Sequence, residues 1–168
     1  MPLRAAKLSS GFDAVAQWVV FALDNGRYAL PLASTLRIVR AAEITPLPSA
    51  PSLVLGALNV GGEVLPVFNV RRRFGLAERP LDAGDHLLIA RTADRTVVLL
   101  IDSAVGVIDP PTDVRVAASR ITSELSHISG VLPLEDGLVL IHDLDLFLSA
   151  AESLKLHDAL EREAQRAG

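Results

Sequence analysis

The sequence predicts a mainly β protein, built as two five-stranded barrels followed by one C-terminal α-helix. Short runs of Val, Leu and Ile between Trp18 and Ile141 are interrupted about every eight to twelve residues by turn-forming residues, as in a barrel or a sandwich. These runs form two series, and about ten strands would leave a large cavity inside one small barrel. After Asp143 the apolar period lengthens to three or four residues, which indicates a helix.

The first series opens with a predicted hairpin. Trp18 to Leu23 and Tyr28 to Leu32 flank residues 24–27, where Asn and Gly tolerate the positive φ of a tight turn. Thr35 to Val39 is the predicted third strand. Ile44 to Pro51 contains three prolines, which lack a backbone donor and stop a ladder, so we expect an extended, exposed loop there.

A second hairpin is predicted around Gly61-Gly62, a connection suited to a type I′ or II′ turn between Val54 to Val60 and Glu63 to Phe68. Both faces of the first of these strands are apolar, so we expect it to be covered on two sides. Core packing is the more common reason for such residues, and contact with a partner is the alternative.

The second series follows residues 77–84, whose Pro80 and Gly84 suggest the division between the barrels. Residues 115–125 are compatible with a strand or a short helix. The remaining strands are expected at His86 to Arg91, Thr96 to Ile101, Val105 to Ile108, Ser129 to Leu134 and Leu138 to Ile141.

The terminal helix is predicted over residues 143–165, with Asp143 as its N-cap and fraying beyond Glu161. It would cover the core, although its charged end could reach a partner. Its expected apolar face consists of Leu144, Phe147, Leu148, Ala151 and Leu154.

Composition excludes several classes of protein. The chain has no Cys, so disulfides and thiolate chemistry are excluded and the cytoplasm is the expected compartment. Residues 1–14 are expected to be a disordered lead without the apolar core of a secretory signal, and no segment is apolar for long enough to insert in a membrane. The net charge is −4 and the basic residues are scattered except at 71–73, so nucleic acid is not an expected partner. We expect those three arginines to be solvated.

Enzymatic chemistry is not expected either. His86, His127 and His142 each adjoin an Asp or Ser, but neighbours on a strand point to opposite faces and rarely form a base and its orienting group. The glycines do not form a phosphate-binding turn that opens a helix. We therefore expect no catalytic residue, no metal and no cofactor.

Several motifs resemble those of the CheW-like domain family, over about residues 15–155. Tyr28-Ala29-Leu30-Pro31 resembles the family's aromatic, small, aliphatic, proline strand, and Ile44 to Pro51 its proline-rich connection. Asn59 to Arg71 is similar to the most specific family motif, an Asn-Leu-Arg-Gly turn followed by Pro-Val and Asp-Leu-Arg. Phe74-Gly75-Leu76 closes that motif in the usual way.

This resemblance implies a fold of two intertwined SH3-like barrels and an adaptor that performs no chemistry. It would couple the cytoplasmic tips of chemoreceptors, bound between the barrels, to the regulatory domain of a CheA-type histidine kinase, bound barrel to barrel. Membrane-associated receptor arrays would then recruit it from the cytoplasm. The binding surface implied for the kinase and receptor consists of Thr35, Arg37, Ile38, Val54, Gly56, Leu58, Asn59, Val60, Gly61 and Gly62.

Two departures alter that surface. Gly61 stands where the family's turn normally has Arg, which removes a guanidinium capable of bidentate contacts. Arg37 stands where the family often has an acidic residue, which reverses the local charge. The missing arginine favours an alternative, a divergent regulator that binds or sequesters a histidine kinase without coupling it to receptors.

Overall fold

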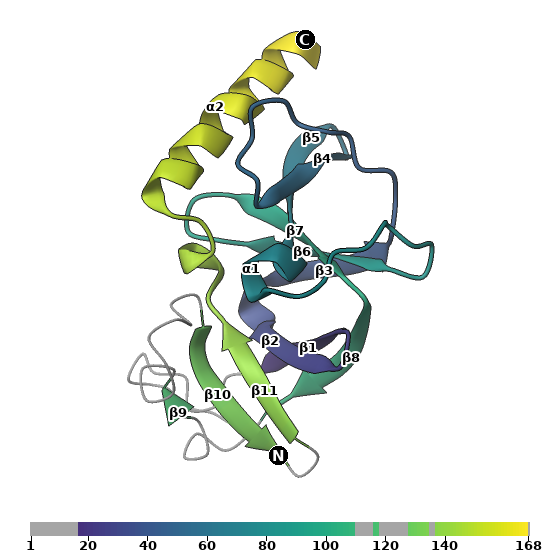
Figure 1. Cartoon of the computed structure of the whole chain (residues 1–168), viewed down its shortest axis with the longest axis vertical. Coiled ribbons are helices and arrows are strands. Elements are labelled where there is room, and N and C mark those ends of the chain that lie inside the picture. The colour runs from purple at the N-terminus through teal and green to yellow at the C-terminus, as the bar shows by residue number, and fades with distance from the viewer. Residues whose placement is uncertain (1–16, 110–115, 118–127, 135–136, 168) are drawn as a thin grey trace.

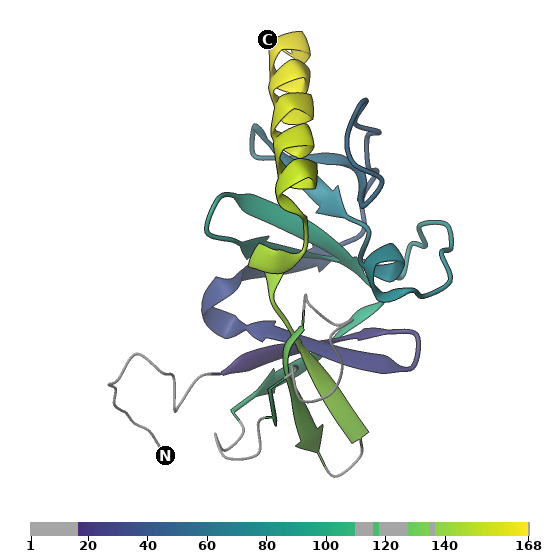
Figure 2. The same cartoon turned by 60° about the vertical axis from the view of Figure 1, so that its left-hand side comes forward.

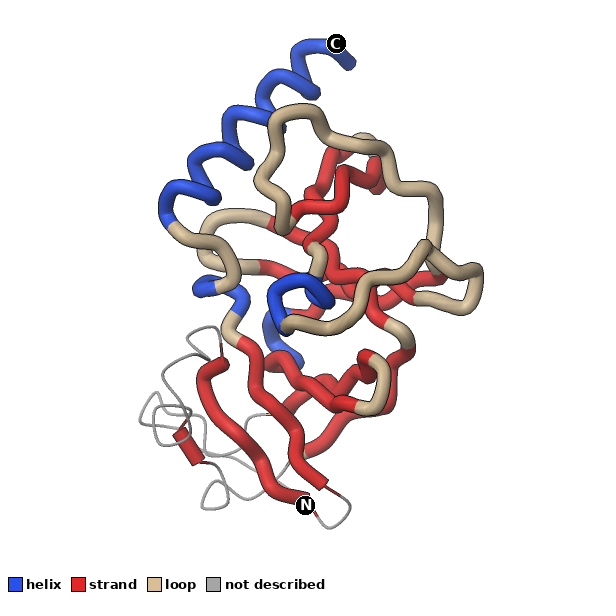
Figure 3. The backbone as a smooth tube through the Cα atoms, in the orientation of Figure 1, coloured by secondary structure: helices blue, strands red, loops and turns tan. Residues whose placement is uncertain are grey.

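The computed structural model describes residues 17–109, 116–117, 128–134 and 137–167. They form two β-sheets and a C-terminal helix (Figure 1). The backbone trace shows strands through the body of the molecule and a long helix, α2 (Ala150–Ala167), at one end (Figure 3). The predicted class, mainly β with a C-terminal helix, is confirmed.

One sheet has six strands in the order β8-β1-β2-β11-β10-β9, and the other has five in the order β3-β6-β7-β5-β4. The six-stranded sheet contains β1 (Trp18–Leu23), β2 (Gly26–Pro31), β8 (Ser103–Ile108), β9 (Val116–Ala117), β10 (Ile128–Leu134) and β11 (Gly137–His142). The five-stranded sheet contains β3 (Thr35–Arg40), β4 (Val54–Val60), β5 (Glu63–Phe68), β6 (His86–Arg91) and β7 (Thr96–Ile101).

The six-stranded sheet has one strand more than the sequence predicts, and this additional strand is β9. It is two residues long and lies in the segment 115–125, which is compatible with either a strand or a short helix. The rest of that segment lies outside the described residues, as does the predicted lead at 1–14.

The two sheets are intertwined because the chain leaves the six-stranded sheet after β2 and returns to it at β8. It first crosses through a short 3₁₀ helix, Leu32–Ser34, and crosses back at Asp102. Residues 77–84, predicted to divide the barrels, instead connect helix α1 (Val70–Phe74) to β6, and β5 and β6 share one sheet. Pro80 and Gly84 therefore turn the chain within one half of the protein.

Both predicted hairpins form. Gly61 and Gly62 make the β4–β5 turn with φ of 59° and 93°, as expected for residues at a type I′ connection. The β1–β2 turn is tighter than predicted, because β2 already begins at Gly26. There the positive φ, 53°, is adopted by Asp24 and by neither Asn25 nor Gly26.

Contrary to the prediction, the proline-rich segment is not exposed along its whole length, although Thr45 itself is exposed. Leu47 is buried in the core, and Thr45 forms a bridge with Ala57 of β4 through N–H···O bonds of 2.9 and 2.7 Å. The segment therefore replaces a strand along the outer edge of β4. Gly56 permits this close approach, since a Cβ atom there would overlap the carbonyl oxygen of Thr45.

The main core lies between the two sheets, and each sheet is also buried on its other face. This explains why so many strands are apolar on both sides. The main core includes Phe21, Leu23, Leu30, Phe68, Leu88, Leu99, Ile101, Phe147 and Leu156.

The C-terminal segment departs most from its prediction. Asp143 caps only a 3₁₀ turn, Leu144–Leu146, and α2 begins at Ala150 behind Ser149. Ser149 and Glu152 form a reciprocal capping box, with N–H···O distances of 3.1 and 2.8 Å. The later start changes the buried face: Leu156 and Ala159 are buried, whereas Leu154 is 64% exposed. The helix extends to Ala167.

Candidate functional site

Five charged residues meet where the chain crosses between the sheets, and we call this group the charged junction. It consists of Asp24, Arg71, Arg79, Asp85 and Asp102. Asp24 lies in the β1–β2 turn, Arg71 on α1, and Asp102 between β7 and β8. The junction therefore connects both sheets with the short helix α1.

Helix α1 places Arg71 by local capping. The Asn69 side chain accepts a hydrogen bond from the Arg72 N–H at 3.1 Å, and Gly75 ends the helix at a φ of 74°. The Arg71 side chain is then only 11% exposed. The expectation that arginines 71–73 are all solvated is wrong for this residue, because its charge is used inside the molecule.

Arg71 binds both of its acidic neighbours through Nη2. This atom lies 2.8 and 2.9 Å from the two carboxylate oxygens of Asp102, and 2.9 Å from Oδ1 of Asp24. Its Nη1 donates to the Ala77 carbonyl at 2.9 Å. Asp102 also accepts a hydrogen bond from the backbone N–H of Asp24 at 2.7 Å. One carboxylate thus holds a turn of one sheet and a helix attached to the other.

Arg79 extends the junction to Asp85. Its guanidinium donates to the two Asp85 oxygens at 3.0 and 2.6 Å, and to Asp102 at 2.7 Å. Asp85 is buried and also accepts from the Asp82 N–H at 2.9 Å. Each charge therefore faces an opposite charge, which compensates the loss of solvation.

The junction shifts the pKa values of its members. Burial alone would raise the pKa of Asp102, but the Asp24 N–H and the Arg71 guanidinium outweigh it and hold this pKa below its usual range. Burial of Asp85 is likewise outweighed by Arg79 and the Asp82 N–H, so its pKa is lowered. The pKa of Arg71 is raised, mainly by its hydrogen bond to Asp24. Asp85, Asp102 and Arg71 are therefore charged at neutral pH.

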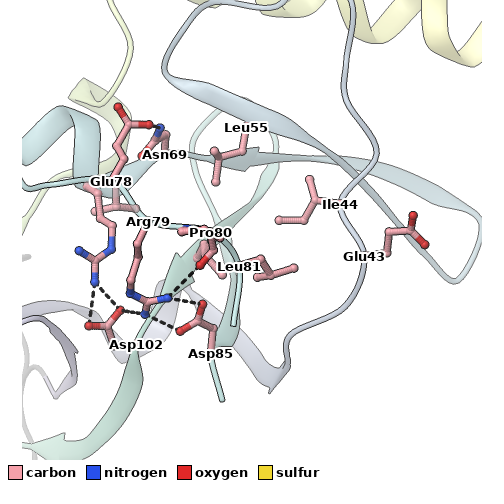
Figure 4. A pocket seen from close by; sticks show the side chains of 13 residues that line it. Glu43, Ile44, Leu55, Asn69, Glu78, Arg79, Pro80, Leu81, Asp85 and Asp102 are labelled. Carbon is pink, nitrogen blue, oxygen red and sulfur yellow. Dashed lines mark hydrogen bonds and ion pairs between the residues drawn. The ribbon is translucent and has the colours of Figure 1, made fainter. Parts of the chain in front are cut away.

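A pocket of about 370 Å³ opens beside the junction (Figure 4). Arg79, Asp85 and Asp102 line one side, and Ile44, Leu55 and Leu81 line the other. Among the residues that the structure describes, no three His, Asp or Glu side chains are placed so that they could hold a metal ion. Each charge of the junction is paired with an opposite charge, so the arrangement suits the joining of the two sheets better than proton transfer.

The predicted surface residues are divided between the two ends of the five-stranded sheet. Thr35, Arg37 and Ile38 lie on β3, at one end of the strand order. Val54 to Val60 lie on β4, at the other end, and Gly61-Gly62 at the tip of its hairpin. Strands β6, β7 and β5 lie between β3 and β4 in the strand order.

Several of these residues have structural roles. Val54 and Gly56 are buried, Gly56 beneath the proline-rich segment. The Asn59 side chain accepts a hydrogen bond from the Gly62 N–H at 2.9 Å and so stabilises the turn. A bulge between Val54 and Gly56 also places Val54 on the opposite face from Leu58 and Val60.

The exposed members of the predicted surface form two smaller groups. Arg37 projects from β3, and Asn59, Gly61 and Gly62 occupy the exposed β4–β5 tip. Thr35 and Ile38 are half-buried, and Thr35 donates a hydrogen bond to the Pro31 carbonyl at 3.2 Å.

Sequence reasoning missed an exposed apolar strand. In β8, at one end of the six-stranded sheet, Val105 is 55% exposed and Val107 is 52% exposed. The valines gave no signal of this exposure, because Val in a strand is usually buried and the place of β8 at the end of the sheet follows only from the strand order.

The fold and the junction define a β protein of two interleaved sheets. A family model described as the CheW-like domain matches residues 17–152 of the chain. The chain therefore belongs to the CheW-like domain family.

Individual relatives agree with this membership. The chain is 29% identical over 150 residues to a chemotaxis protein CheW of Treponema pallidum, covering 86% of this chain and 88% of the relative. It is 31% identical over 90 residues to a chemotaxis protein CheW of Helicobacter pylori, covering 54% of each. The crystal structure of the scaffolding protein TtCheW from Thermoanaerobacter tengcongensis shares the fold, with a TM-score of 0.75 at 22% identity over 82% of this chain and 95% of that one.

Within the part of the chain that the structure describes, no helix combines the length and the apolar character needed to cross a membrane.

Proposed function

We propose that this protein is a non-enzymatic adaptor that couples chemoreceptors to a CheA-type histidine kinase. The observation that carries the proposal is the CheW-like domain match over residues 17–152. Its relatives include proteins named for chemotaxis, and a protein of the same fold is described as a scaffolding protein. Recruitment to membrane-associated receptor arrays is part of the same proposal.

The receptor tip is assigned to the exposed face of β8. Val105 and Val107 offer apolar side chains at a strand that begins directly after Asp102, where the chain passes between the sheets. A helical receptor tip could bury an apolar face against them. The charged junction supports this use, because it fixes the strand relative to the five-stranded sheet.

The kinase regulatory domain is assigned to the β4–β5 hairpin. Its tip is exposed, and the Asn59 hydrogen bond holds the tip in a defined shape before binding. The two assigned surfaces belong to different sheets, so one chain can hold both partners at once.

Binding measurements with purified partners test this assignment. Titration calorimetry with a receptor tip fragment, and separately with a kinase regulatory domain, should detect both interactions. We expect Val107→Asp to weaken receptor binding by roughly tenfold or more, since it places a charge in an apolar contact, and to leave kinase binding unchanged. Loss of both interactions with retained folding would contradict separate surfaces.

A second candidate is a regulator that binds the kinase without coupling it to receptors. Gly61 supports it, because the turn presents no side chain where the family's arginine would stand. This candidate predicts kinase binding with no detectable receptor binding, so the same two titrations distinguish it from the adaptor.

A further inference from the structure

A groove between the β4–β5 hairpin and α2 adjoins the surface assigned above to the kinase regulatory domain. It has a volume of about 640 Å³ and is open to solvent. We call it the hairpin groove. The apolar side chains of Val64, Leu160 and Ala164 line it, together with Gly62, Glu63 and Glu161. In Figures 1 and 2 this hairpin and α2 lie side by side, at the end of the molecule away from β8 to β11.

One wall of the groove is formed by α2, in a part of the chain that the family model does not match. The lining residues on α2 begin at His157, and the family match ends at residue 152. Contacts with the core hold the helix in place, because Leu156 and Ala159 are buried on its inner face. The groove is therefore a fixed concave surface with an apolar floor.

The hairpin side of the groove is unobstructed. Gly61 and Gly62 adopt positive φ, and a Cβ atom built on either would meet nothing within 4 Å. The two turn positions therefore carry neither the family's arginine nor any other side chain. A partner can approach the backbone of the turn directly.

The charge of the groove is acidic. Glu63 forms no ion pair with any described residue, and Glu161 faces only His157, at 3.7 Å. No lysine or arginine lines the groove. An apolar floor with two glutamates at its edge is complementary to an apolar side chain flanked by basic residues.

From these observations we infer that the hairpin groove binds a basic segment of the kinase regulatory domain, with an apolar side chain of that segment seated between Val64 and Ala164. This inference rests on the proposed adaptor function. The groove lies away from β8, the surface assigned to the receptor, so the kinase is the partner it fits. The lost arginine and the acidic groove then act together, by selecting a kinase whose contact surface is basic.

Charge reversal and blocking test the inference in the full-length chain. Glu63→Lys combined with Glu161→Lys should weaken binding to the kinase regulatory domain by roughly tenfold or more, because each change replaces attraction by repulsion. Ala164→Trp, an exposed substitution that fills the groove, should weaken it to a similar extent. The matched control is Asp158→Lys, on the same helix but outside the groove lining, and it should bind within about twofold of the original chain.

A salt titration distinguishes an electrostatic contribution to kinase binding from a structural effect of the substitutions, because only the electrostatic contribution depends on NaCl concentration. Raising NaCl from about 50 to about 300 mM should weaken binding of the original chain more than binding of the Glu63→Gln, Glu161→Gln double variant. Circular dichroism of each variant verifies folding, and the exposed Glu63 variants keep the test decisive if Ala164→Trp fails to fold.

The outcomes separate the inference from the function on which it rests. If the original chain binds the kinase domain and the groove variants bind equally well, the inference is overturned and the adaptor function stands. If the original chain binds no kinase domain, the proposed function fails and the inference fails with it. If sedimentation velocity shows that the chain self-associates and that Glu63→Lys with Glu161→Lys abolishes this, the occupant is a second copy and the assignment to the kinase is wrong.

Discussion

Asp102 and Arg71 form the contact that joins the two sheets, with Nη2 of Arg71 at 2.8 and 2.9 Å from the two carboxylate oxygens of Asp102. Asp102 is the residue at which the chain passes from β7 to β8, and Arg71 belongs to the helix that follows β5. Because Asp102 also accepts the Asp24 N–H, the orientation of the β1–β2 hairpin depends on the same carboxylate.

Removal of this carboxylate should destabilise the fold. Asp102→Ala leaves the largely buried Arg71 with Asp24 as its remaining acidic partner, and we expect the free energy of unfolding to fall by about 2 to 3 kcal/mol. Urea denaturation followed by Trp18 fluorescence measures this change. Arg166→Ala is the control, since the exposed Arg166 pairs with Glu163 on the surface of α2, where such a pair contributes less than about 1 kcal/mol. Equal losses for the two variants would contradict the central role of Asp102.

The junction should also make the free energy of unfolding depend on pH in the acidic range. The pKa values of Asp85 and Asp102 are lower in the folded state than in the unfolded chain, so their contribution is fully present above the ordinary carboxyl pKa of about 4. It is lost as the pH falls through the folded pKa values. We expect the free energy of unfolding to decrease from about pH 5 to about pH 2, and the Asp85→Asn, Asp102→Asn double variant to lose less over this range. Parallel slopes for the two proteins would disprove the assignment.

Gly56 should tolerate no side chain. The Cβ atom of Gly56→Ala would overlap the Thr45 carbonyl oxygen and lie 2.8 Å from Cγ2 of Ile44, so the proline-rich segment must move. We expect a loss of about 1 to 3 kcal/mol in unfolding free energy. Gly61→Ala, a change in open space at positive φ, should lose only about 1 kcal/mol. Thermal melts of both variants measure these losses. A larger loss of stability for Gly61→Ala than for Gly56→Ala would be inconsistent with the observed packing.

Phe147 should hold the terminal helix on the body of the protein. Its fully buried ring stacks on Phe68 with centroids 4.4 Å apart, and the Arg73 guanidinium lies 5.4 Å above it. Phe147→Ala should lower the unfolding free energy by about 3 to 5 kcal/mol and speed hydrogen exchange throughout α2. Leu154→Ala, at an exposed site of the same helix, should change neither quantity appreciably. Unchanged exchange in Phe147→Ala would show that α2 is held by other contacts.

Local patterns were sufficient to predict most of the strands. The Gly61-Gly62 connection fixed the register of β4 and β5, because only a two-residue turn fits between these apolar runs. The start of the terminal helix was harder to place. Asp143 and Ser149 are both good N-caps, and the Ser149-x-x-Glu152 capping box was the signal in the sequence that favoured the later start.

The candidate site was less predictable because it depends on contacts between residues far apart in sequence. Nothing in the run of three arginines distinguishes Arg71 from Arg72, yet one is buried against Asp102 and the other is exposed beside Glu78. The pairing depends on the return of the chain from β7 to the first sheet. In the same way, the division of Arg37 and Asn59 between opposite ends of the sheet follows from the strand order, which a single sequence does not contain.

The most direct test of the adaptor function is reconstitution with a CheA-type kinase and a receptor fragment from the same organism. Kinase autophosphorylation is measured with each component alone, with each pair, and with all three. The proposed function predicts that this chain stimulates autophosphorylation only when the receptor fragment is also present. Suppression of the kinase, or the same activity with and without the chain, would contradict it.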